Sequence, residues 1–336
     1  ALATDPAIDA LYTDQAYLSP DGVPQESFKK PDWSPEFIRG VMYVGHLLVV
    51  RRSLAREVGG FDSRFDKVQD FEFMLRVGER TSKIHHIPRV LYYWRRIRGS
   101  VALGGDEKSD IPALQAAAVT AHLDRLGIAA TASPNPRHAH RVCLTARPRP
   151  QPPSVTVFLR PGAGKRVSEG CLHAILAGGH ACSLSVFVVG CHKSAGPSGI
   201  TTSSHVQYCD TDPVLDCCSF SSDELAAIPG DYWVSMRADL EPGDRNWLDP
   251  LLSCADRPRV MFVAPEILQA GGAIAEAGLY ITAQGEVHPL MRGWSPESDG
   301  YAGSLSCTRE TTLLSAQCLV THRKNLLRFC PSRISY

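Results

Sequence analysis

The sequence has no excess of charge of either sign. Its 336 residues include 35 Lys and Arg and 35 Asp and Glu, so the formal net charge at pH 7 is zero. Nucleic-acid-binding domains usually carry a basic excess, and no acidic tail is present either. We therefore expect no nucleic-acid partner, although the local cluster of Arg95, Arg96 and Arg98 could meet an anionic ligand.

Long apolar runs are also missing. One of the longest, residues 41–50, is far shorter than the ~20 residues of a membrane span, and His46 interrupts it. The first residues lack the basic stretch and the apolar core of a signal peptide. The sequence does not start with Met, so we expect it to be a piece of a longer protein.

Cysteine is absent from the first 142 residues, and all eleven cysteines lie from Cys143 onward. None forms a C-x-x-C pair, although Cys217 and Cys218 are adjacent. In a chain of this length, such scattered cysteines indicate buried free thiols in a reducing compartment rather than disulfides. Their one-sided distribution, together with the chain length, predicts two globular domains.

In residues 1–128, short strands alternate with short helices, which predicts an α/β layer structure. We expect strands over residues 8–12 and 47–50, and a pair over 83–88 and 90–94 that Pro88 separates. Helices are expected to start at Ser34 and at Ser53, and a longer one should span residues 111–126.

A further helix should begin near residues 68–77, where the sequence reads VQDFEFMLRV. Asp70 lies just ahead of its apolar stripe, close to unpaired backbone N–H groups at the positive end of the helix. Asp70 is therefore an N-cap, a general base that accepts a hydroxyl proton, or both. We interpret Glu72 as a solvated helix charge or as the partner of an arginine.

Several short segments in residues 4–127 resemble, in the same order, motifs of the family-2 glycosyltransferases with the GT-A fold. The likeness is to enzymes of the bacterial polysaccharide or O-antigen type. The matching segments are residues 28–36 (FKKPDWSPE), 43–46 (YVGH), 51–54 with 57–61 (RRSL, EVGGF), 69–72 (QDFE), 83–88 (KIHHIP) and 91–95 with 99–100 (LYYWR, GS). A chance match of six motifs in register is improbable.

The resemblance implies a fold and a mechanism. The fold would be the GT-A, nucleotide-diphospho-sugar transferase-like mixed sheet flanked by helices, in two units. A nucleotide-sugar donor would bind with a divalent metal, Mn²⁺ or Mg²⁺, and an acceptor hydroxyl would attack the anomeric carbon with inversion. The carboxylate of the family's "ED" motif takes the proton, and this role carries over to Asp70.

The resemblance also suggests binding residues. Trp33, His46 and Gln69 would line the acceptor cleft, and Arg95 would meet the donor phosphate as a bidentate donor. For three of these residues a purely structural role is the alternative. Trp33 could be a packing residue, His46 a satisfied core histidine and Arg95 a surface strand charge.

Several positions depart from the family. Ile97 stands where the family usually has a His, and residues 12–16 read YTDQA in place of "YSDED". The donor half, with its metal-binding D-x-D, should precede Ala1. Residues 1–128 are therefore predicted to be the C-terminal, acceptor and base half of a GT-A domain.

Residues 129–153 are rich in Pro and Arg and are predicted to be an extended linker. A strand, a helix and a strand are expected over residues 155–159, 167–177 and 184–189, which indicates a parallel sheet. The loop 161–165 (PGAGK) resembles a P-loop, but Leu159 and Arg166 replace its first Gly and its Ser or Thr.

Residues 154–336 resemble, more faintly, the N-terminal half of a GT-A domain whose functional residues are lost. Gly190 stands in place of the uridine-binding Asp, and Arg237-Ala238-Asp239 in place of D-x-D. We expect no metal site in this chain. The run of His138, His140 and Cys143 and the His85-His86 pair both lack the ligand pattern of structural zinc.

The sequence thus predicts a glycosyltransferase of cell-surface polysaccharide synthesis, cytoplasmic and associated peripherally with the inner face of the membrane. Its partners would be a nucleotide-sugar donor and a glycan or lipid-linked glycan acceptor. The alternative is an inactive pseudo-glycosyltransferase that binds glycan or acts as a scaffold. A weaker third option is a composite site in which the second half supplies the donor side to Asp70.

Overall fold

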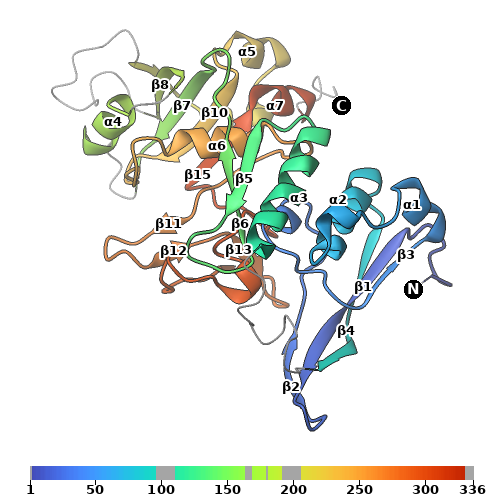
Figure 1. The fold of residues 1–336 in the computed structure, drawn as a ribbon. Coiled ribbons are helices and arrows are strands. Elements are labelled where there is room, and N and C mark those ends of the chain that lie inside the picture. Colours follow the sequence, from blue (N-terminus) through green and yellow to red (C-terminus); the bar gives the residue numbers. More distant parts are fainter. Residues whose placement is uncertain (1, 96–109, 163–168, 179–180, 191–205, 330–336) are drawn as a thin grey trace. The chain divides into compact units, whose positions relative to one another are not determined.

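The computed structural model describes residues 2–95, 110–162, 169–178, 181–190 and 206–329 (Figure 1). The chain forms two compact units, each built from two stretches of sequence. Unit 1 comprises Ala1–Thr145 and Pro296–Glu310, and unit 2 comprises Ala146–Ser295 and Thr311–Tyr336. The expectations for Arg96, Ile97 and Arg98, and for residues 163–166 of the P-loop-like segment, fall outside the described residues.

Strand β1 (Ala10–Leu18) is the centre of the unit 1 sheet. On one side it pairs antiparallel with β3 (Leu48–Val50) and then with β2 (Pro24–Phe28), and on the other it pairs parallel with β4 (Ile84–Arg95). The strand predicted over residues 8–12 therefore continues to Leu18. It does so because its polar residues, such as Asp14, find hydrogen-bond partners inside the sheet.

Strand β4 corrects the prediction of two strands separated by Pro88. It is continuous, but its pairing with β1 jumps from Thr13↔Ile87 to Asp14↔Val90. Pro88 lies in this bulge, and among the described residues β4 pairs with β1 alone. A proline that lacks a backbone N–H is tolerated at such an edge position.

The helical segments of unit 1 are η1 (Phe37–Arg39), α1 (Arg52–Glu57), η2 (Ser63–Phe65), α2 (Gln69–Arg80), α3 (Ile111–Arg125) and η6 (Tyr301–Gly303). The apolar stripe predicted for α2 is confirmed, since Phe71, Met74 and Leu75 are buried in one core with Tyr12 and Leu123. Burying such a stripe is what fixes a short helix against its sheet.

Part of the predicted linker is folded. Strands β5 (Ala130–Pro134) and β6 (Val142–Ala146) form a two-stranded sheet instead of an extended polyproline segment. Ala130 and Val142 are buried in the unit 1 core, with Ala132 and Leu144 packed against it. Apolar residues two positions apart thus outweigh the proline content, which is concentrated after residue 147.

Unit 2 is built on a five-stranded sheet with the order β15-β10-β7-β8-β9. Its strands are β7 (Ser154–Arg160), β8 (Ser183–Val189), β9 (Val206–Cys209), β10 (Tyr232–Arg237) and the antiparallel β15 (Cys318–His322). The other four are parallel, so the strand–helix–strand prediction around α4 (Glu169–Leu176) is confirmed. The strand order reverses between β7 and β10, where α/β sheets commonly bind ligands.

The remaining elements of unit 2 are short. They are η5 (Cys217–Ser219), α5 (Ser222–Ala227), α6 (Leu248–Ala255), α7 (Arg323–Phe329), β11 (Ile267–Leu268), β12 (Ile274–Glu276), β13 (Leu279–Ile281) and β14 (Val287–Pro289). Both units are mixed α/β structures, as predicted. Within the described ranges, no helix has the length and apolar character needed to cross a membrane.

Candidate functional site

Helix α2 begins at Gln69, and its N-cap residue is Val68, whose side chain is buried and makes no capping hydrogen bond. Asp70 is therefore the second residue of the helix, and its interpretation as the N-cap is wrong. Val68 takes the cap position because its side chain packs into the core. The Asp70 carboxylate still lies at the positive helix end, where Oδ1 accepts the backbone N–H of Phe71 at 2.8 Å.

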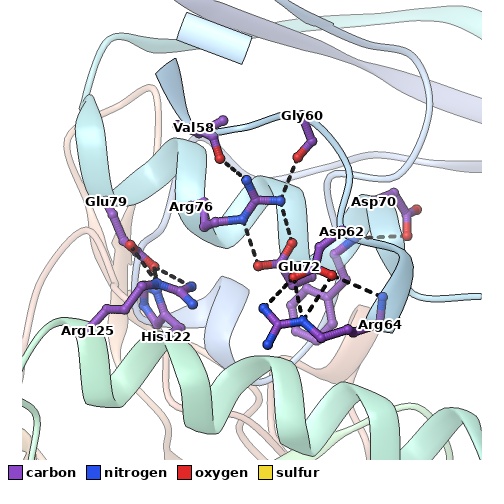
Figure 2. Close-up of polar contacts among 11 residues, drawn as sticks. Val58, Gly60, Asp62, Arg64, Asp70, Glu72, Arg76, Glu79, His122 and Arg125 are labelled. Carbon is purple, nitrogen blue, oxygen red and sulfur yellow. Dashed lines mark hydrogen bonds and ion pairs between the residues drawn. The ribbon is translucent and has the colours of Figure 1, made fainter. Parts of the chain in front are cut away.

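Three other acids on or near α2 are neutralised by basic side chains (Figure 2). Asp62 receives the guanidinium of Arg64, with distances of 3.0 and 2.6 Å to Oδ2. Glu79 at the far end of α2 accepts from His122 and Arg125, each at 2.7 Å. Among the described residues, by contrast, Asp70 forms no ion pair and is half-buried.

Glu72 belongs to the neutralised group. It is buried and forms a bidentate pair with Arg76, at 2.7 Å (Nε to Oε1) and 2.6 Å (Nη2 to Oε2). Arg76 also donates to the carbonyl oxygens of Val58 and Gly60. The interpretation of Glu72 as an arginine partner is thus confirmed, and that of a solvated charge is wrong.

The ion pairs of Asp62 and Glu79 keep both carboxyl groups ionised. Hydrogen bonds from Arg64 lower the pKa of Asp62 to about 2. Burial opposes ionisation of Glu79, but the hydrogen bonds from His122 and Arg125 outweigh it and lower the pKa of that carboxyl. Both groups hold their charge for structural partners. The base role of Asp70 stays a prediction.

Gln69, predicted to contact the acceptor, precedes Asp70 on the helix. Its side-chain Oε1 is buried and has no hydrogen-bond partner in the described part of the chain. Buried acceptors are normally satisfied. The acceptor role of Gln69 stays a prediction.

Trp33 lies at the other end of α2. Its indole packs against Gly78 so closely that a Cβ there would be 2.7 Å from Cζ2, and its ring centroid is 6.4 Å from that of Tyr43. Gly78 is about 12 Å along the helix axis from Asp70. The contacts of Trp33 are those of the packing alternative, and its acceptor role stays a prediction.

His46 and Arg95 are associated with the end of β4. The His46 ring is half-buried, with its centroid 5.2 Å from that of Tyr92 and 5.1 Å from that of Trp94. Arg95 is exposed, and its Nη1 donates to the carbonyl of Pro20 at 3.2 Å. Both binding roles stay predictions. His46 contacts Trp94, the sequence neighbour of Arg95, but the contacts of Arg95 itself are elsewhere, at Pro20.

A buried polar cluster in unit 1 was missed from the sequence. His86 bridges two carboxylates, with Nε2 2.9 Å from Oδ1 of Asp14 and Nδ1 3.1 Å from Oδ1 of Asp32. Lys30 donates its backbone N–H to the same Asp14 oxygen, and its Nζ reaches the carbonyls of Val44 and His46, each at 2.5 Å. The signal was the alternation in β4, which buries His86 and exposes His85, as the predicted opposite faces require.

Burial opposes charge on both Lys30 and Asp14 in this cluster. It lowers the pKa of Lys30 to about 7, against the attraction of Asp14. Burial also disfavours the charged form of Asp14, but hydrogen bonds from Lys30 and His86 prevail and lower its pKa. The buried members Asp14, Lys30 and His86 are therefore satisfied by their partners, while the Asp32 carboxylate lies exposed at the edge of the cluster.

The divalent metal implied by the family resemblance does not fit these residues. Asp239 is paired with the guanidinium of Arg237, whose Nε donates to its Oδ1 at 2.9 Å. Gly190 offers no carboxylate. Hard cations need several free oxygen ligands. In the described segments, no three His, Cys, Asp or Glu side chains are grouped so that they could hold a metal ion.

Comparison with known proteins gives two similar sequences, and no protein-family model matches. The chain is 28% identical over 333 residues to "O-antigen biosynthesis protein RfbC" of Myxococcus xanthus, covering 96% of this chain and 26% of that protein. It is 27% identical over 334 residues to "Uncharacterized protein y4gI" of Sinorhizobium fredii, covering 95% and 36%. The chain thus spans about a quarter of the first relative and just over a third of the second. Over nearly all of its own length it is similar to a protein named for O-antigen biosynthesis.

Proposed function

We propose that this chain is part of a glycosyltransferase of cell-surface polysaccharide synthesis, in which Asp70 is the general base. The name of the Myxococcus xanthus relative supports a role in polysaccharide synthesis. The resemblance of residues 4–127 to family-2 enzymes supports a glycosyl-transfer reaction. Residues 1–128 would supply the acceptor half of a GT-A unit. Because the chain matches only 26% of that relative, the transfer reaction is proposed for the whole protein.

The observation that carries the proposal is that Asp70 forms no ion pair with the described residues, whereas Asp62, Glu72 and Glu79 each hold one (Figure 2). In the proposed step, the acceptor hydroxyl passes its proton to Asp70 as its oxygen bonds to the anomeric carbon. The bond from that carbon to the nucleoside diphosphate breaks, so the configuration inverts. A base in this position contributes about 10²–10⁴-fold to such a rate.

We further propose a nucleotide sugar as donor and a glycan or lipid-linked glycan as acceptor, at the cytoplasmic face of the membrane. Gln69, with its unsatisfied buried oxygen, would receive a hydroxyl of the acceptor next to Asp70. Cell fractionation tests the location, because the protein should be recovered with membranes at low salt and released at high salt.

A second function is favoured by unit 2. There Arg237 pairs with Asp239, and the uridine-binding position of the family is Gly190. These features suit an inactive module that binds glycan or assembles a synthase. Calorimetric titration with UDP- and dTDP-sugars plus Mn²⁺ separates the two, since only an active transferase should give heat of donor binding.

The base role is tested in the intact protein with Asp70→Asn. We expect transfer to fall by about 10²-fold or more, with unchanged donor affinity. Asp66→Asn is the matched control, because it makes the same change at an exposed carboxyl four residues earlier. Full transfer activity of the Asp70→Asn protein would refute the proposal.

A further inference from the structure

Four ring-bearing side chains, Tyr17, His46, Tyr92 and Trp94, gather on one face of the unit 1 sheet, and we call this group the aromatic platform. The Tyr17 and Trp94 rings stack with centroids 6.1 Å apart and an interplanar angle of 27°. The His46 ring contacts both Tyr92 and Trp94. All four side chains are half-buried, so each is packed on one side and open on another.

The bulge in β4 creates this platform. Between Thr13↔Ile87 and Gln15↔Tyr92, β1 advances two residues and β4 advances five. Without the three extra residues, continued pairing from Ile87 would set Leu91 beside Tyr17; the bulge sets Trp94 there instead. Bulges that re-aim side chains in this way are common beside functional sites.

The loop that brings His46 to the platform is held on two sides. The buried ammonium of Lys30 donates to the carbonyls of Val44 and His46, each at 2.5 Å. The His46 N–H points to Oε1 of Gln15 at 3.4 Å. The main chain at His46 is thereby held where its ring contacts Tyr92 and Trp94, which contributes to the preorganisation that a binding surface needs.

The surroundings select the class of ligand. Aromatic faces are partly negative and attract polarised C–H groups, while ring N–H and O–H groups at their rims hydrogen-bond to polar neighbours. A sugar ring offers both, a face of C–H groups and a rim of hydroxyls. Arg95 lies on the opposite face of β4 from Trp94, so this described residue does not bring a cation for a diphosphate to the platform.

We infer that the aromatic platform is a carbohydrate-binding subsite that holds a neutral sugar ring of the acceptor glycan. This inference rests on the proposed function for the identity of the glycan as an acceptor. In Figure 1 the outer parts of β1 and β4 extend beyond the helices α1, α2 and α3 of their own unit, which leaves this end of the sheet uncovered by them.

The test uses the whole chain and a panel of neutral hexasaccharides of glucose, mannose, galactose, rhamnose and N-acetylglucosamine, with binding read by saturation-transfer NMR and tryptophan fluorescence. We expect at least one to bind, and Trp94→Ala and Tyr92→Ala to weaken its binding about tenfold or more. Trp94→Phe, which keeps an aromatic face, should retain most of the affinity. Tyr93→Ala is the matched control, because Tyr93 is 51% exposed on the other face of the same strand.

The inference is overturned if no hexasaccharide binds the wild-type chain, if Tyr93→Ala weakens binding as much as Trp94→Ala, or if UDP displaces the sugar. The Asp70→Asn variant distinguishes failure of this inference from failure of the proposed function. That variant should bind the hexasaccharide normally and lose transfer. Binding without transfer in the wild-type full-length protein would leave the platform in place and remove the transferase.

Discussion

Arg76 and Glu72 form a bidentate ion pair one turn apart on α2, with a Glu72 side chain only 2% exposed. Because Arg76 also holds the carbonyls of Val58 and Gly60, this pair ties the loop before the helix to the helix itself. The second acid of the QDFE segment is thus structural, whereas the first, Asp70, forms no ion pair within the described part of the chain.

This difference predicts that the two acids fail in different ways when they are neutralised. Glu72→Gln should lower the free energy of unfolding by about 3 kcal/mol, because it leaves the Arg76 charge without its partner. Asp70→Asn should change that free energy by no more than about 0.5 kcal/mol, as expected for a residue outside buried networks. Urea denaturation measures both, and equal losses would contradict the assignment.

Lys30 predicts a rise of stability with alkaline pH. Its pKa is lowered by burial to about 7 in the folded chain, from the 10.5 expected for the unfolded one. Between these values the unfolded state binds more protons, so the free energy of unfolding increases with pH, by up to about 1.4 kcal/mol per pH unit. Below about pH 7 the cost of charging Lys30 is fully present.

The measurement is the difference in unfolding free energy between the wild type and Lys30→Met from pH 7.5 to 8.5. This window lies below the ordinary cysteine pKa of 9.0, and burial raises the pKa of thiols such as Cys171 and Cys318 further. The wild type should show the steeper slope. Parallel slopes would show that the Lys30 ammonium does not titrate there.

His122 predicts a loss of stability in mild acid. Its Nε2 accepts from Nε of Arg39 at 3.2 Å and its Nδ1 faces Glu79, so the neutral ring is the one that fits. Burial lowers its pKa below 6.5, with Arg39 and Arg125 adding to the effect and Glu79 opposing it. The unfolded chain therefore takes up the proton first, and stability, complete above pH 6.5, declines as the pH falls.

Thermal or urea unfolding between pH 5.5 and 7 checks this expectation against His122→Gln, which should have a flatter profile. The comparison cancels other histidines whose pKa is lowered, such as His140 and His322. The stabilisation of the fold by ionised Glu79 is also lost on acidification. That loss occurs below the ordinary glutamate pKa of 4.5 and therefore outside this range. Identical profiles would show that His122 does not contribute.

Gly78 predicts an unfavourable helix substitution. Gly78→Ala would gain about 1 kcal/mol of helix propensity, but its Cβ would lie 2.7 Å from the Trp33 indole. We expect a net loss of about 1 kcal/mol and a shifted tryptophan emission. Combining Gly78→Ala with Trp33→Phe should be less damaging than the sum of the two single changes, since the bulk that clashes is gone. Strict additivity would show that the two residues do not meet.

Much of the secondary structure could be predicted because its signals are local. The apolar stripe of α2 and the parallel pair of β7 and β8 both follow from short-range patterns. The continuity of β4 through Pro88 could not, because it depends on β4 lying at the edge of the described sheet. The strands β5 and β6 were hidden for a related reason, since proline content was weighed without the core that they cover.

For the candidate site, the sequence alone determined that Asp70 stands at the start of an amphipathic helix, within a series of segments that resemble motifs of family-2 glycosyltransferases. Tertiary structure decided which acids form ion pairs with basic side chains. It also brought His86 within hydrogen-bond distance of Asp14, 72 residues away in the chain. Periodicity and helix starts act over a few residues and can be read along the chain. Ion pairs and the aromatic platform depend on strand register and burial, which only the folded sheet fixes.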